Sequence, residues 1–189
     1  LQNLNEGKLQ KFDIAKVNDD YMISSLTLGI LADIAQNVSS SEKKKFGPFT
    51  YLKDAYKVIR HNKSYRIELK YNGKTKALKT KLLLITMTDT IGGRQALSLD
   101  AKVDDGLIRV YSLKEINLLK ILFHLNKLRK GQLEDFMEIT YFDTDHLEIS
   151  AQSNKKQDIP YSRIDGDKSS PLPLDITVYR KGLTTVVPK

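Results

Sequence analysis

The segment 64–88 constrains the fold most, because it joins strand alternation, a tight turn and a buried run: "SYRIELKYNGKTKALKTKLLLITMT". Apolar side chains at 65, 67, 69 and 71 alternate with charged side chains at 66, 68 and 70, which predicts a strand with one buried face. Asn72-Gly73 supplies the positive φ angles of a two-residue type I′ turn. The return strand ends in the apolar run Leu82–Ile85, which predicts burial on both faces.

Other short apolar runs predict more strands. The segment 12–23 reads as a second hairpin, because an Asn-Asp-Asp cluster at 18–20 separates two strand-like runs. Further strands are expected at Leu107–Leu113, Ile139–Phe142, His146–Ser150, around Ile164, at Ile176–Tyr179 and at Thr184–Val187.

Three segments have helical periodicity. Apolar residues at 28, 31, 34, 35 and 38 follow the spacing of a buried helical face, and similar patterns occupy 49–61 and 114–128. The predicted class is therefore α+β, mainly an antiparallel β-sandwich with inserted helices. We expect residues 1–189 to form a single sandwich domain.

Composition narrows the chemistry. The chain of 189 residues has no cysteine, which excludes disulfide scaffolds, thiolate nucleophiles and cysteine-bound zinc. Its three histidines share no metal-ligand spacing. The net charge of +8 favours anionic partners such as nucleic acid, acidic lipid headgroups or phosphorylated small molecules. The segment "LQNLNEGKLQ" lacks an initiating methionine, so we expect a part of a longer protein.

Two acidic turns are the candidate functional features. "DDG" at 104–106 precedes a strand, and "IDGD" at 164–167 lies between two strand-like runs. Asp and Gly are common turn formers, so both motifs have a purely structural interpretation. The functional alternative is a hard-cation site, in which a carboxylate and nearby carbonyl oxygens bind Mg²⁺ or Ca²⁺.

The order of these motifs resembles the carboxy-terminal half of the diacylglycerol kinase catalytic family. These are bacterial lipid kinases, related to sphingosine and ceramide kinases and to NAD kinases. The resemblance extends from about Phe12 to Lys189. It rests on the ordered segments "DAKVDDGLIRV", "ITYF", "HLEIS", "SRIDGD", "PLPLDITV" and "TTVVPK".

The resemblance implies particular site residues. In the family, the second Asp of Asp-Asp-Gly binds a structural Mg²⁺ together with two main-chain oxygens. Carried over, these ligands are Asp105 and the carbonyls of Lys102 and Leu107. The acidic residue that closes the second motif is the family's proton acceptor, which here is Asp167.

The resemblance also implies the carboxy-terminal domain of a two-domain, ATP-dependent lipid kinase that phosphorylates a diacylglycerol-like hydroxyl. The Gly-Gly-Asp-Gly-Thr nucleotide motif is absent from this sequence. We therefore expect ATP to be bound mainly by an amino-terminal α/β domain outside this chain, and this chain to be inactive alone. The expected partners are ATP, Mg²⁺ and a lipid at the membrane surface, and nucleic acid is not expected. The expected location is cytoplasmic and peripheral to the membrane, and the expected assembly is a homodimer.

Three competing interpretations remain. A non-catalytic sandwich could bind anionic lipid through its lysines, and the basic segment 63–81 could bind nucleic acid, with a steep salt dependence in that case. The chain could also be half of an NAD-kinase-like enzyme.

Overall fold

The computed structural model describes residues 7–29, 64–88, 90–91, 94–95, 102–114, 139–152 and 159–187. Within these residues the regular secondary structure is entirely β. The strands are β1 (Lys8–Val17), β2 (Asp20–Met22), β3 (Ser25–Gly29), β4 (Tyr65–Tyr71), β5 (Lys74–Thr80), β6 (Leu82–Thr86), β7 (Thr90–Ile91), β8 (Arg94–Gln95), β9 (Ile108–Leu113), β10 (Ile139–Thr144), β11 (His146–Ala151), β12 (Tyr161–Ile164), β13 (Asp167–Pro171) and β14 (Leu174–Val187). No helix in this part of the chain is long and apolar enough to cross a membrane.

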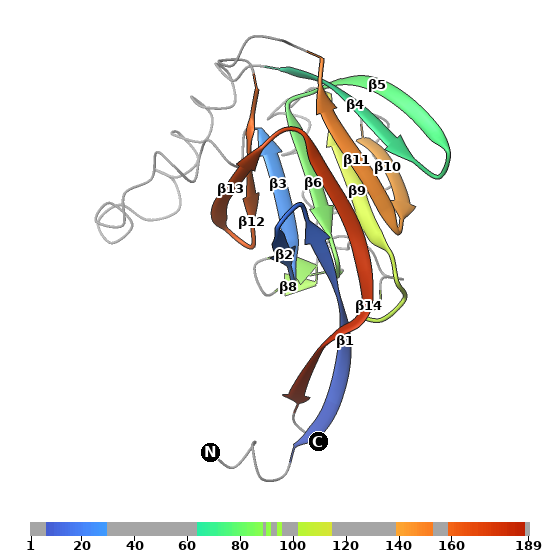
Figure 1. Ribbon diagram of the computed structural model, residues 1–189, viewed down its shortest axis with the longest axis vertical. Coiled ribbons are helices and arrows are strands. Elements are labelled where there is room, and N and C mark those ends of the chain that lie inside the picture. Colours follow the sequence, from blue (N-terminus) through green and yellow to red (C-terminus); the bar gives the residue numbers. More distant parts are fainter. Residues whose placement is uncertain are drawn as a thin grey trace, which may run out of the picture.

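The strands form two six-stranded antiparallel sheets (Figure 1). Sheet A has the order β2-β1-β14-β11-β4-β5, and sheet B has the order β10-β9-β6-β3-β12-β13. A small hairpin of β7 and β8 accompanies them. The β-sandwich predicted from the sequence is therefore confirmed.

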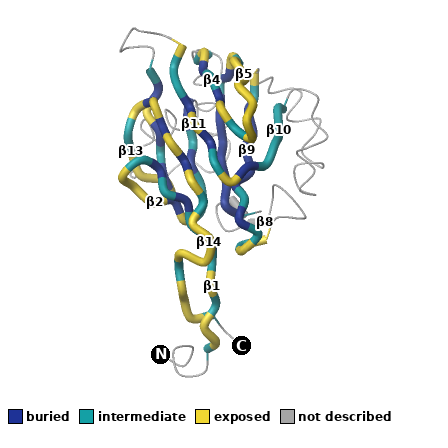
Figure 2. The backbone as a smooth tube through the Cα atoms, turned by 45° about the vertical axis from the view of Figure 1, so that its right-hand side comes forward, coloured by how far each residue is buried: buried dark blue, intermediate teal, exposed yellow. Residues whose placement is uncertain are grey.

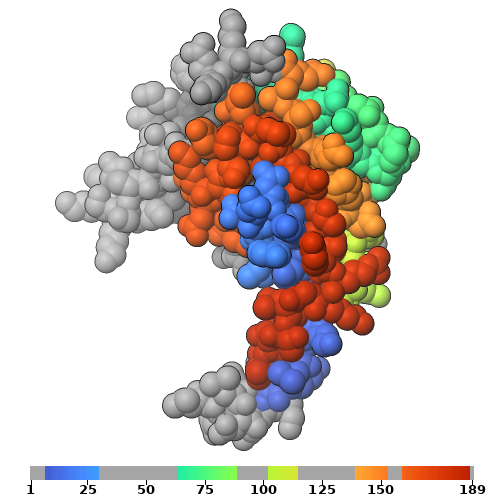
Figure 3. Space-filling model, in the orientation of Figure 1, coloured from blue at the N-terminus to red at the C-terminus, as the bar shows by residue number. Residues whose placement is uncertain are grey.

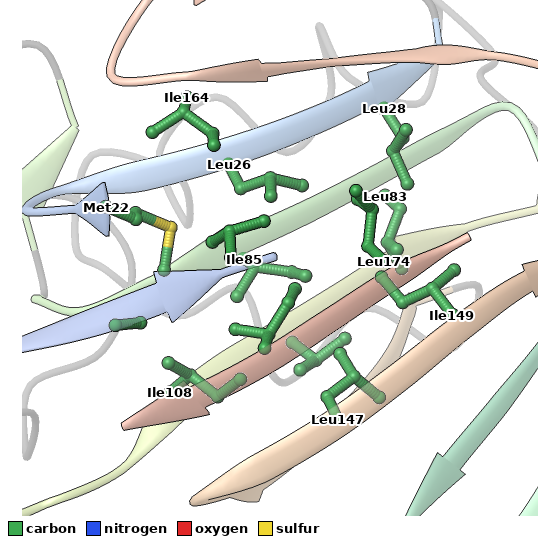
Figure 4. Packing of buried hydrophobic residues seen from close by; sticks show 14 of the residues in the cluster. Met22, Leu26, Leu28, Leu83, Ile85, Ile108, Leu147, Ile149, Ile164 and Leu174 are labelled. Atoms are coloured by element: carbon green, nitrogen blue, oxygen red, sulfur yellow. The ribbon is translucent and has the colours of Figure 1, made fainter. Parts of the chain in front are cut away.

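The core lies between the two sheets (Figure 4). Leu26, Leu83 and Ile85 of sheet B and Leu69 and Leu147 of sheet A are each fully buried in it. A second, smaller cluster of Leu84 and Tyr111 lies on the opposite face of sheet B. Side chains on both faces of β6 are thus buried, as its unbroken apolar sequence predicts.

The hairpin of β4 and β5 is confirmed, with φ values of 49° and 69° at Asn72 and Gly73. The apolar run after it is not the end of the return strand. The chain leaves sheet A after Thr80 and enters sheet B as β6, where it pairs with β3 and β9. The buried Thr80 hydroxyl lies 2.6 and 3.0 Å from the carbonyl oxygens of Leu82 and Leu113, and its single proton bonded to either acceptor stabilises this crossing.

β1 and β14 form a long ribbon that extends beyond the sandwich (Figures 1 and 3). Its outer part is mostly exposed (Figure 2), and Lys8 and Val187 pair at its tip. The separate strands predicted at 176–179 and 184–187 are one strand, β14. Its register against β1 shifts between Phe12 and Ile14, and Lys181 has a positive φ of 55°, so an irregularity replaces the expected break.

One helix prediction is wrong at its start. The helical spacing at 28–38 includes Leu28, but Leu28 lies in β3, where Leu26 and Leu28 are buried and alternate with Ser25 and Thr27. The remainder of that helix and the patterns at 49–61 and 115–128 lie outside the described residues. β13 was not predicted, because "DKSSP" has little strand propensity and forms by pairing with β12.

Candidate functional site

The two acidic turns lie at the same end of sheet B. Arg109 at the start of β9 pairs with Thr86 at the end of β6, and Thr86 pairs with Ser25 at the start of β3. Ser25 accepts a 2.8 Å hydrogen bond from the N–H of Asp165, which follows β12. Three strand spacings of about 4.8 Å therefore separate the backbones of Arg109 and Asp165 by roughly 14 Å.

The Asp105 carboxylate accepts four donors. Its Oδ1 accepts the Leu107 N–H at 3.1 Å and Nη1 of Arg109 at 3.1 Å. Its Oδ2 accepts the Lys102 N–H at 3.0 Å and Nη2 of Arg109. Arg109 Nη1 also donates to the Leu107 carbonyl at 3.2 Å. The arginine side chain is 5% exposed and the carboxylate 21%, so this ion pair is largely shielded from water.

The pKa values of Asp105 and Arg109 both shift in the direction that favours the charged form of each group. Burial acts to raise the pKa of the Asp105 carboxyl, but Arg109 and the N–H groups of Lys102 and Leu107 hold that pKa below its ordinary value. Burial acts to lower the pKa of the Arg109 guanidinium, but the Asp105 carboxylate raises that pKa above its ordinary value. Each charge thus stabilises the other.

The predicted metal ligands do lie together, but the Asp105 carboxylate and the Leu107 carbonyl already accept hydrogen bonds. A carboxylate offers about four lone-pair positions, and each Asp105 oxygen accepts two donors. Lys102 and Leu107 contact Asp105 through their N–H groups. Among the described residues no three His, Asp or Glu side chains could hold a metal ion. Mg²⁺ binding by Asp105 stays a prediction, and it does not fit this arrangement unless Arg109 is displaced.

A buried carboxylate that the sequence did not reveal supports the "DDG" turn. Asp13, at the irregularity of β1, is 4% exposed and accepts the N–H groups of Gly106 and Lys181, each at 2.6 Å. The backbone N–H of Asp13 donates to the Val103 carbonyl at 2.9 Å. Asp13 therefore joins the acidic turn to both strands of the ribbon. The available signal was a charged residue in phase with the buried positions 15 and 17.

The second acidic turn is held by Asp165. Its carboxylate accepts the N–H groups of Ile23, Ser24 and Ser25, each at 2.8 Å. Its φ of 50° is a left-handed conformation that Asp tolerates better than most residues, and Gly166 follows with a φ of 97°. Three charge-assisted hydrogen bonds thus hold the turn against the β2–β3 connection.

Asp167, the predicted proton acceptor, is exposed at the start of β13. Within the described part of the chain its carboxylate makes no hydrogen bond or ion pair. Its backbone pairs with Ile164, and Ser169 two residues on donates to Asp20 at 2.6 Å. The uncommitted Asp167 carboxylate therefore lies on a turn that hydrogen bonds of Asp165 and Ser169 hold in place.

Comparisons with known proteins agree with this fold. Residues 24–187 match the family described as the YegS C-terminal NAD kinase beta sandwich-like domain. The diacylglycerol kinase of Bacillus subtilis is 25% identical over 183 residues, covering 97% of this chain and 59% of that protein. A Staphylococcus carnosus relative assigned as a lipid kinase is 27% identical over 177 residues, covering 92% of this chain and 56% of the relative.

Solved structures share the fold. A Bacillus anthracis structure assigned as a diacylglycerol kinase has a TM-score of 0.70 at 19% identity, with 94% of this chain and 56% of that chain covered. A second diacylglycerol kinase structure from the same organism has a TM-score of 0.64 at 13% identity, with 94% and 53% covered. The chain thus spans somewhat more than half the length of these proteins. Because the family match extends over most of the sequence, the chain belongs to the YegS C-terminal NAD kinase beta sandwich-like family.

Proposed function

We propose that this chain is the carboxy-terminal sandwich domain of an ATP-dependent lipid kinase that phosphorylates a diacylglycerol-like hydroxyl. The family match and relatives named as diacylglycerol kinases support this proposal. Those relatives are longer than this chain. We therefore assign ATP binding, with the Mg²⁺ that accompanies its phosphates, mainly to the remainder of the protein. A lipid acceptor and a peripheral, cytoplasmic position at the membrane belong to the same proposal.

Asp167 is the proposed general base. As the lipid hydroxyl oxygen bonds to the γ-phosphorus of ATP, the bond from that phosphorus to the β–γ bridging oxygen breaks and ADP leaves. The Asp167 carboxylate takes the hydroxyl proton in this step. The observation that carries the assignment is its exposed, uncommitted carboxylate on a turn that Asp165 anchors through three backbone hydrogen bonds.

Asp167→Asn in the full-length protein tests the assignment. The amide cannot accept the proton, so we expect lipid-dependent ADP release to fall by at least about 10²-fold, the lower range for general-base catalysis. The melting temperature should stay unchanged, because the side chain is exposed. Asp19→Asn, another exposed aspartate in a turn, is the matched control and should retain activity. Normal turnover by Asp167→Asn would refute the base assignment.

Two further measurements test the remainder of the proposal. The 189-residue chain alone should release no ADP from ATP in the presence of diacylglycerol, since it lacks the glycine-rich nucleotide motif. Robust turnover by this chain would contradict the assignment of ATP binding to the remainder of the protein. Full-length protein that phosphorylates NAD and leaves diacylglycerol unmodified would contradict the lipid acceptor.

A further inference from the structure

We propose that the Arg109 guanidinium occupies the position of a structural cation between the Asp105 carboxylate and the Leu107 carbonyl, so that this acidic turn is held without a metal ion. The inference concerns the turn itself and does not depend on the kinase proposal.

Arg109 contacts three oxygen atoms of the acidic turn. Its two Nη atoms contact both oxygens of Asp105, and Nη1 also contacts the Leu107 carbonyl oxygen. A carboxylate and a main-chain carbonyl from the same turn are ligands that a hard cation takes. The planar guanidinium matches a carboxylate with two parallel donors, so it can bind the same oxygens through hydrogen bonds.

A second carboxylate, that of Asp143, adds to the negative charge around the arginine. Asp143 on β10 is the cross-strand partner of Arg109 on β9, and its charge adds to that of Asp105 in raising the arginine's pKa. Within the described residues, Oδ1 of Asp143 is buried and has no hydrogen-bond partner. The charges of two carboxylates therefore act on one nearly buried cation. A positive charge stabilises this site, and a side chain of the protein carries that charge in place of a bound ion.

The Asp105 carboxylate already accepts as many donors as its lone pairs allow. Backbone N–H groups of Lys102 and Leu107 take one position on each carboxylate oxygen, and Arg109 takes the other. A metal ion could reach this carboxylate only by displacing the guanidinium, which would leave a buried arginine unpaired at a large cost. The arginine and the ion therefore exclude each other.

Thermal melting of the 189-residue chain tests the proposal. For the wild type we expect the same Tm in EDTA and in millimolar MgCl₂. Arg109→Met retains the aliphatic stem but removes the charge. Its Tm should fall by roughly 10 °C, the scale for a buried pair that loses one partner in a chain of this size. Because two carboxylates then lack a cation, millimolar MgCl₂ should restore part of this loss.

The controls make each outcome decisive. Arg66→Met, an exposed arginine on β4, should change neither Tm nor its Mg²⁺ dependence. If Arg109→Met does not fold, Arg109→Gln replaces it, because the neutral amide also removes the positive charge but can still donate a hydrogen bond. A saturable rise of wild-type Tm with MgCl₂ would overturn the proposal. So would an unchanged Tm in the Arg109 variant, or a loss that MgCl₂ leaves unaltered.

Discussion

The buried carboxylate of Asp13 accepts the N–H of Gly106 at 2.6 Å, across 93 positions of the sequence. This hydrogen bond joins the irregular centre of β1 to the acidic turn before β9. The same carboxylate accepts the N–H of Lys181 on β14, so one side chain connects three segments. The position of the "DDG" turn is therefore coupled to the ribbon of β1 and β14.

Asp13→Ala should destabilise the protein strongly. The N–H groups of Gly106 and Lys181 would lose their acceptor, and an unsatisfied buried donor costs about 1–3 kcal/mol. We expect a free energy of unfolding lower by about 2–5 kcal/mol, measured by urea denaturation. Asp104→Ala is the control, because Asp104 is exposed in the same turn and should change stability by less than about 0.5 kcal/mol. Equal effects of the two substitutions would contradict the role of Asp13.

Asp165→Ala should loosen the second acidic turn. It removes the acceptor of three backbone N–H groups and places alanine at a φ of 50°. We expect a loss of about 2 kcal/mol or more in the free energy of unfolding.

Hydrogen exchange gives a second measurement of the Asp165 variant. The amides of Ile23, Ser24 and Ser25 should exchange faster in Asp165→Ala than in the wild type. Asp167→Ala, two residues away and exposed, should leave both stability and exchange unchanged. Unaltered exchange at residues 23–25 in Asp165→Ala would show that its carboxylate does not hold this turn.

Two glycines with similar backbone conformations should respond differently to alanine. Gly29 and Gly73 have φ values of 87° and 69°. A Cβ at Gly29 would lie 2.3 Å from the Lys81 carbonyl oxygen, whereas a Cβ at Gly73 would meet nothing within 4 Å.

Gly73→Ala should therefore cost about 1–2 kcal/mol from backbone strain alone. Gly29→Ala should cost clearly more, because the β3–β6 pairing must also move to relieve the contact. Urea denaturation of both variants measures the difference. A Gly29→Ala protein as stable as Gly73→Ala would contradict the close packing at the end of β3.

The ion pair of Asp105 predicts a pH dependence with a definite sign. Its carboxyl has a folded-state pKa below the ordinary value, so its contribution to stability is complete above about pH 3.9, the ordinary pKa. That contribution is lost as the pH falls through the folded-state value.

The Tm difference between the wild type and Asp105→Asn should therefore be largest near neutral pH and shrink in acid. Circular dichroism melting of both proteins across this range measures it. A difference that stays constant down to strongly acidic pH would contradict the lowered pKa.

The sequence alone determines those turns and strands that follow from the properties of neighbouring residues. Asn72-Gly73 tolerates positive φ at two successive positions, so the hairpin of β4 and β5 follows from its own residues. The unbroken apolar run 82–85 predicts burial on both faces, because no polar side chain marks a solvent face. Leu28 was ambiguous, since both a helical spacing and the two-residue alternation of β3 include it.

Only the tertiary structure decided what the acidic turns contact. Asp165 meets Ser25 across 140 positions, a contact that depends on the pairing of β3 with β12. Asp105 and Arg109 are only four positions apart, but their ion pair requires the β9 register that buries the arginine beside β10. A sequence shows which side chains could hold a cation or a turn. Strand packing decides whether an arginine side chain lies next to the carboxylate and supplies the positive charge that a metal ion would otherwise bring.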